Sequence, residues 1–112
     1  MTLQIDSEHL DRVFAALADP IRRDLLNRLA DRDLSAGELA EGFAVSRPAV
    51  SRHLRVLREA GLVTVRVDGR ERWFSLDSNG VTDAEAWLTE LRDQWRVSLF
   101  SLRSFVEEGG SE

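Results

Sequence analysis

The arginines of this 112-residue chain are concentrated between Ser46 and Arg72. The stretch holds seven arginines against three acidic residues, whereas the rest of the chain holds eight against seventeen. All 15 basic residues are arginine, and the formal net charge is −5. A guanidinium can donate paired hydrogen bonds to guanine O6 and N7 or to a phosphate. Because local charge rather than net charge meets the phosphates, a basic face on an acidic body predicts contact with nucleic acid.

Two short helices must position the first of these arginines. Ser35-Ala-Gly-Glu38 has the pattern of a capping box and predicts that a helix starts there. Ser46 is placed to cap a second helix, over about 47–60, and Gly61 to end it. Residues 36–60 therefore predict a helix-turn-helix whose turn spans 42–46. Its second helix, which we call the recognition helix, is expected to enter a DNA groove.

A hairpin must position the remaining arginines. Residues 62–67 and 70–76 alternate with the period of a strand, and Asp68-Gly69 between them is a strong signal for a type I′ turn. Residues 62–76 are therefore predicted to form a wing beside the recognition helix. Arginines near such a tip suit phosphates or a minor groove.

The helical period separates two faces of the recognition helix. Val50, Leu54 and Leu57 share the predicted buried face, and the opposite face is small, polar and cationic. His53 lies at the edge of the buried face, so structural packing is an alternative to base contact for it. The predicted DNA-binding residues are Ser46, Arg47, Pro48, Ser51, Arg52, His53, Arg55, Arg66, Arg70 and Arg72.

Helices are also predicted at both ends of the chain. Residues 7–31 read as two helices, the first capped by Ser7 and the second opened by Asp19-Pro20. A capping-box pattern at 82–85 opens a long helix over 82–107. An apolar stripe runs along this helix, with Trp87 and Phe105 flanking it: Leu88, Leu91, Trp95, Leu99, Leu102 and Val106. A domain of this size has few elements left to cover that stripe, so we expect a second copy to cover it.

Two segments resemble the ArsR-type (arsenic-repressor-like) winged helix-turn-helix regulators. The first is ALADPIRRDLLNRL, of which residues 18–23 are the most specific part. The second is LSAGELAEGFAVSRPAVSRHLRVLREAGLVTVRVDGRERWFSL, residues 34–76, with Val50-Ser-Arg-His-Leu54 as its most specific part. The resemblance implies a homodimeric repressor that binds double-stranded DNA at a palindromic operator. It also implies dimerisation through the first and last helices, with interface residues Leu10, Phe14, Leu91, Trp95, Leu99 and Leu102.

The chain departs from the family pattern at the metal sites. Cysteine is absent and only two histidines occur, neither of them on the last helix. Carboxylates alone match zinc, copper or arsenite poorly, so we expect no metal site and no cofactor. An unknown small-molecule or protein effector is left open, with Trp73, Trp87 and Trp95 either lining its pocket or serving as core and interface residues.

The fold class expected is mainly α with a β-hairpin, in the order ααααββα, as one domain over 1–112. No catalytic motif accompanies the few histidines, so no enzyme is expected. The longest apolar stretch has six residues, far short of the roughly 20 that span a bilayer, and a cytoplasmic protein without membrane contact is expected. Alternatives are a MarR-like regulator that responds to a small molecule and a winged helix that binds only proteins.

Overall fold

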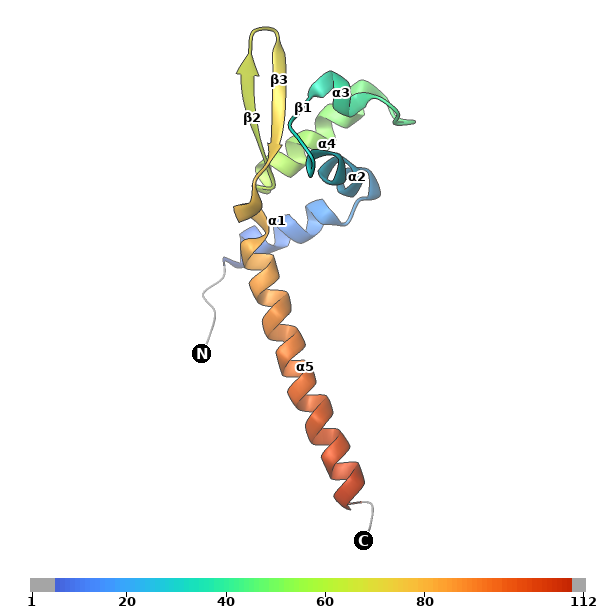
Figure 1. Cartoon of the computed structure of the whole chain (residues 1–112), viewed down its shortest axis with the longest axis vertical. Helices are drawn as coiled ribbons and strands as arrows, with labels where there is room; N and C mark the ends of the chain where they lie inside the picture. Colours follow the sequence, from blue (N-terminus) through green and yellow to red (C-terminus); the bar gives the residue numbers. More distant parts are fainter. Residues whose placement is uncertain (1–5, 110–112) are drawn as a thin grey trace.

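A small body of helices and one sheet carries a long last helix that extends far beyond it (Figure 1). The structure is a computed structural model that describes residues 6–109. The α-helices are α1 (Ser7–Leu17), α2 (Pro20–Leu29), α3 (Ala36–Ala40), α4 (Arg47–Glu59) and α5 (Thr82–Gly109). The strands are β1 (Leu34–Ser35), β2 (Val63–Asp68) and β3 (Glu71–Leu76), and a 3-10 turn, η1 (Ser78–Val81), precedes α5. The predicted mainly helical fold with an antiparallel hairpin is confirmed.

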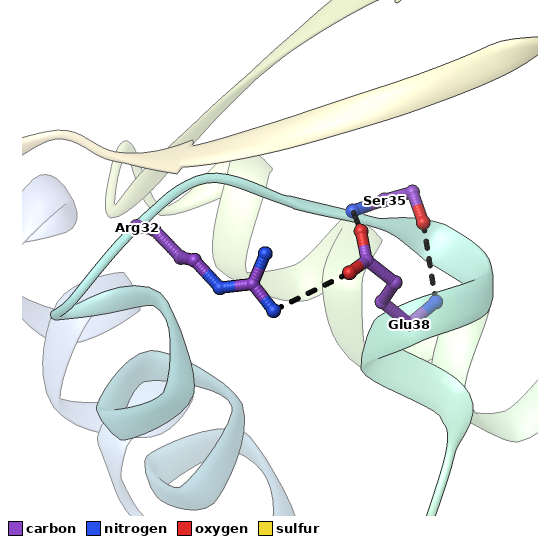
Figure 2. A network of polar contacts seen from close by, with 3 residues as sticks. All are labelled: Arg32, Ser35 and Glu38. Atoms are coloured by element: carbon purple, nitrogen blue, oxygen red, sulfur yellow. Dashed lines mark hydrogen bonds and ion pairs between the residues drawn. The ribbon is translucent and has the colours of Figure 1, made fainter.

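Side-chain caps start the central helices where the sequence predicts them. The Asp19 carboxylate accepts hydrogen bonds from the amides of Ile21 and Arg22, which opens α2. Figure 2 shows the capping box of α3, in which Ser35 and Glu38 each accept from the other's backbone amide. That bond from Ser35 lowers the pKa of Glu38. These caps supply acceptors to amides that a helix start leaves without partners.

Three predicted boundaries of the outer helices are wrong. Asp6, not Ser7, caps α1, because its carboxylate accepts from the amides of Glu8 and His9. Helix α2 ends at Leu29 rather than at residue 31. Thr82 already has helical φ and ψ of −58° and −47°, so it cannot act as an N-cap. Instead, the 3-10 turn η1 continues without a break into the first turn of α5.

The wing belongs to a three-stranded antiparallel sheet in the order β1-β3-β2. Strand β1, two residues long, was not predicted, because it is too short to show a period. Asp68 pairs with Glu71, so the hairpin turn is Gly69-Arg70, one residue later than predicted. Gly69 has a φ of +64°, and no other residue type among 6–109 has a positive φ. A type I′ turn needs two such residues, so that prediction is wrong; glycine in the first position suits type II′.

The core joins α1, α2, α3, α4 and the base of the wing. Its largest fully buried side chains are Val13, Leu25, Leu39, Val50, Leu57 and Leu62. The start of α5 is locked onto this body, because a Cβ at Gly80 would collide with the backbone oxygen of Gly61. Phe14 of α1 and Trp87 of α5 add an edge-to-face contact with ring centroids 5.7 Å apart. The base of α5 is therefore fixed, while its distal half stands clear of the body (Figure 1).

Candidate nucleic-acid interface

The core fixes the orientation of α4 through one face. Val50, Leu54 and Leu57 are buried, as predicted. Ser51, Arg52, Arg55 and Arg58 are exposed on the remaining surface of the helix. Because the buried residues cannot rotate out of the core, these polar side chains are presented in a fixed direction. The recognition helix therefore carries its cationic face outward.

The N-terminal end of α4 is exposed and capped. Ser46 Oγ accepts a hydrogen bond from the Ala49 amide at 3.3 Å, so its capping role is present in the structure. Pro48 lies in the first turn of the helix, where its missing N–H costs no hydrogen bond. Arg47 Nη2 lies beside Gly37 of α3, 3.4 Å from where a Cβ would stand. The first turn of α4 thus presents Ser46, Arg47 and Pro48 to solvent.

Two polar recesses separate α4 and α3 from the wing. The larger, about 400 Å³, is lined by Ala36, Ser51, Leu54, Arg55, Arg58, Glu59, Arg72 and Phe74. The smaller, about 260 Å³, lies between the start of α3, Arg47 and the wing residues Arg70 and Arg72. The structure therefore gathers arginines that are up to 25 positions apart in the chain around one hollow face.

The arginines on this face have no acidic partners. Within the described residues, no ion pair involves Arg47, Arg52, Arg55, Arg58, Arg70 or Arg72. Arg58 is not among the residues that the sequence predicts to bind DNA, because the helical period places it at the flank of the exposed face. In the structure Arg58 lines the larger recess together with Arg72 of the wing. A helical wheel represents one helix alone and therefore cannot show that the wing brings a second arginine to this recess. Glu59 and Glu71 also line the recesses, but six arginines outnumber these two carboxylates and the face is cationic overall.

Arg66 differs from the other wing arginines. Its Nη1 donates to Asp33 Oδ2 at 3.0 Å, and its guanidinium lies 5.7 Å from the Trp73 ring centre. The Ser75 hydroxyl and the Arg66 guanidinium together lower the pKa of Asp33. Arg66 thus already has a carboxylate partner on the loop before β1. Contact of Arg66 with DNA stays a prediction, and it would have to compete with this ion pair.

His53 contacts Arg22 of α2. Its Nδ1 lies 3.2 Å from Arg22 Nη1, and the imidazole is half-buried. The same Arg22 side chain donates to the carbonyl oxygens of Ala15 and Ala16 at the end of α1. This arrangement favours the packing role for His53, whereas its contact with a base stays a prediction.

Comparisons with known proteins agree with this geometry. A family model described as a helix-turn-helix domain matches residues 17–66. The HTH-type transcriptional regulator Rv2034 of Mycobacterium tuberculosis is 41% identical over 102 residues, which cover 91% of this chain and 92% of that protein. The transcriptional repressor SdpR of Bacillus subtilis is 34% identical over 79 residues, covering 70% of this chain and 88% of that protein. A crystal structure described as an ArsR family transcriptional regulator superposes with a TM-score of 0.79 at 33% identity, over 84% of this chain and 97% of that one.

The chain belongs to the ArsR family of transcriptional regulators. The resemblance seen in residues 16–29 and 34–76 is thereby confirmed. The family model ends within the wing at residue 66. The alignment with the Mycobacterium tuberculosis relative covers 102 of the 112 residues and so includes the whole cationic face described above.

The predicted dimer residues of this ArsR-family chain differ in burial. Leu10 and Phe14 of α1 and Leu91 of α5 are half-buried. Trp95, Leu99 and Leu102 of α5 are 62%, 65% and 59% exposed. Nothing within the described chain covers them, because the distal half of α5 has no neighbouring element (Figure 1). No helix among the described residues is long and apolar enough to cross a membrane.

The three tryptophans lie against different partners. Trp73 lies beside Arg66 on the wing, Trp87 packs on Phe14, and Trp95 is exposed on α5. An apolar recess of about 330 Å³ does lie between α1 and α5, lined by residues including Phe14, Leu17 and Leu88. Residues 6–109 contain no group of three His, Cys, Asp or Glu side chains arranged to hold a metal ion.

Proposed function

We propose that this ArsR-family regulator is a repressor that binds double-stranded DNA at a palindromic operator as a homodimer. One observation carries the proposal: α4 and the wing place five arginines around two adjoining recesses and expose Arg52 beside them, and none of these six has an ion pair within residues 6–109. Elsewhere in the chain acidic residues outnumber arginines about two to one, so this concentration of charge needs an anionic partner. The relative from Bacillus subtilis is itself named a transcriptional repressor.

The geometry suggests how the DNA would lie. The first turn of α4, with Ser46, Arg47 and Pro48, would enter a major groove, where Arg52 and Ser51 reach base edges. The wing tip, with Arg70, would lie at the adjacent minor groove. The phosphate backbone that separates these grooves would then cross the recess between α4 and the wing. Arg55, Arg58 and Arg72 line that recess and would neutralise its phosphates.

A homodimer through α1 and α5 completes the proposed binding unit. The stripe of Leu91, Trp95, Leu99 and Leu102 continues from the half-buried base of α5 to its exposed distal half. Apolar surface of this extent is covered in stable soluble proteins, and a second copy supplies a matching stripe. Two recognition helices would then meet half-sites about one helical turn apart.

The signal that releases the operator would not be a metal held at family-type sites. The chain has no cysteine, and α5 has no histidine. The carboxylates that remain are hard ligands with little preference for zinc or copper. We propose that the regulator either binds its operator constitutively or responds to a non-metal effector.

A gel-shift titration with the DNA upstream of the protein's own gene tests the proposal. An inverted repeat there should be bound about 10³-fold or more tightly than unrelated DNA of equal length. Footprinting should protect two half-sites about one turn apart. Equal affinity for both DNAs would show that the protein binds DNA without sequence specificity. Absence of binding even at low salt would favour the alternative, a winged helix that binds only proteins.

A further inference from the structure

Arg28, in the last turn of α2, reaches across to the turn between α3 and α4. Its Nη1 donates hydrogen bonds to the backbone carbonyl oxygens of Glu41 at 2.6 Å and of Leu39 at 3.4 Å. Its guanidinium carbon lies 4.0 Å from the centre of the Phe43 ring. Asp24, one helical turn earlier, lies 3.7 Å from its Nη2. One side chain therefore links α2, the end of α3 and the turn.

Besides Arg28, the turn is held by the partly buried side chains of Phe43 and Val45, which pack against the core, and its backbone has few partners. Helix α3 is five residues long and ends at Ala40; Glu41 is extended, and Gly42 has a φ of +81°. The last carbonyl groups of a helix lack donors within the helix and need other partners. In the described part of the chain, residues 42–45 make no backbone–backbone hydrogen bonds. Arg28 supplies the donors, and the ring of Phe43 fixes the plane of the guanidinium.

We propose that Arg28 is a positioning residue for DNA recognition, because it fixes the turn that sets the start of α4. The inference rests on the proposed function, since it takes α4 as the helix that reads DNA. Helix α2 is a firm reference, because Leu25 and Leu29 are buried in the core. Ser46 and Arg47 follow the turn directly, so a displaced turn would displace the residues predicted to reach base edges.

Arginine suits this position better than lysine. A planar guanidinium can stack on Phe43 and donate to two carbonyl oxygens at the same time, with Asp24 on its outer nitrogen. A lysine ammonium keeps the charge but cannot hold all of these contacts. Arg28→Lys is therefore the conservative variant that separates geometry from charge.

Two measurements on the full chain test this role. Backbone NMR relaxation of the free protein reports the turn without DNA. In Arg28→Ala, order parameters of residues 42–45 should fall from a rigid value of about 0.85 to below about 0.6. Binding titrations should show the preference for operator over unrelated DNA falling about tenfold, as expected for loss of one charge-assisted hydrogen bond. Arg28→Lys should show both effects in weaker form, and it serves as the test if the alanine variant does not fold.

Arg32→Ala is the matched control, because it also removes one arginine near α3. Arg32 is exposed, and its one ion pair within the described part of the chain is with Glu38, at 3.5 Å (Figure 2), so its loss should leave both measurements unchanged. The salt dependence of binding should also stay constant in Arg28→Ala, because no phosphate contact is lost.

Each contrary result has a distinct meaning. A turn that stays rigid in both Arg28 variants would overturn the clamp, whether or not the protein binds DNA. A mobile turn with unchanged operator preference would overturn the positioning role. A salt slope smaller by about one per half-site would make Arg28 a phosphate ligand instead. Failure of the wild-type chain to bind any DNA would remove the proposed function, while the relaxation data would still decide the clamp.

Discussion

Arg22 Nη1 lies 3.2 Å from Nδ1 of His53, which joins the two sequence segments that most resemble the ArsR family. The same guanidinium donates to the carbonyl oxygens of Ala16 at 2.8 Å and Ala15 at 3.0 Å. Arg22 thus ties the end of α1 to the middle of α4. Helix α1 belongs to the proposed dimer interface, so this side chain connects the interface to the recognition helix.

Arg52→Ala should remove much of the operator affinity without unfolding the protein. Arg52 is exposed on α4 and has no ion pair among residues 6–109, so its guanidinium can take guanine O6 and N7. Loss of such a contact costs about 1–3 kcal/mol per half-site. Binding titrations measure the loss, and an unchanged circular dichroism spectrum is the control. A loss smaller than about threefold per site would transfer the role to Ser51 or Arg55.

The wing arginines should separate into two classes by salt dependence. Arg70→Ala and Arg72→Ala should each reduce the slope of log affinity against log salt by about 1 per half-site, equally for all sequences. Arg66→Ala is the matched control, because Asp33 already neutralises that guanidinium, and its slope should change less. If base preference changes while the slope does not, the wing reads sequence rather than phosphate.

Metal should have little effect on operator binding. The chain lacks cysteine and carries no histidine on α5, so soft ligands for a switch are missing. Titrations with EDTA, without EDTA and with added zinc should agree within about twofold. A large, reversible zinc effect would point to His9 and its acidic neighbours.

Trp95→Glu should break the proposed dimer and abolish operator binding while every arginine remains. Trp95 lies at the centre of the α5 stripe and is 62% exposed in the single chain. Burying such a side chain contributes about 1.5–3 kcal/mol, and a carboxylate would be desolvated there without a partner. Val97→Glu is the matched control, since Val97 is equally exposed but lies on the opposite side of the helix. Analytical ultracentrifugation should show monomer or aggregate for the first variant and wild-type mass for the second. A dimeric Trp95→Glu that binds normally would place the interface elsewhere.

Local signals in the sequence determined the central elements of this fold. Asp19, Ser35 and Ser46 open helices because a cap acts on amides only two or three residues away. The buried face of α4 is predictable because the helical period repeats within one segment. The cationic recognition helix and the arginine-bearing hairpin could therefore be located from residue types and spacing.

Tertiary packing decided the contacts between distant segments. Arg22 meets His53 across 31 positions and Arg66 meets Asp33 across 33. Strand β1 exists only because β3 pairs with it, and Arg28 becomes important only because α3 ends beside it. None of these contacts produces a pattern in the local sequence. A long charged side chain is the same residue type whether it contacts solvent, a carbonyl oxygen or DNA. The fold supplies the neighbours, and the neighbours decide which arginines hold the protein together and which remain free for a phosphate.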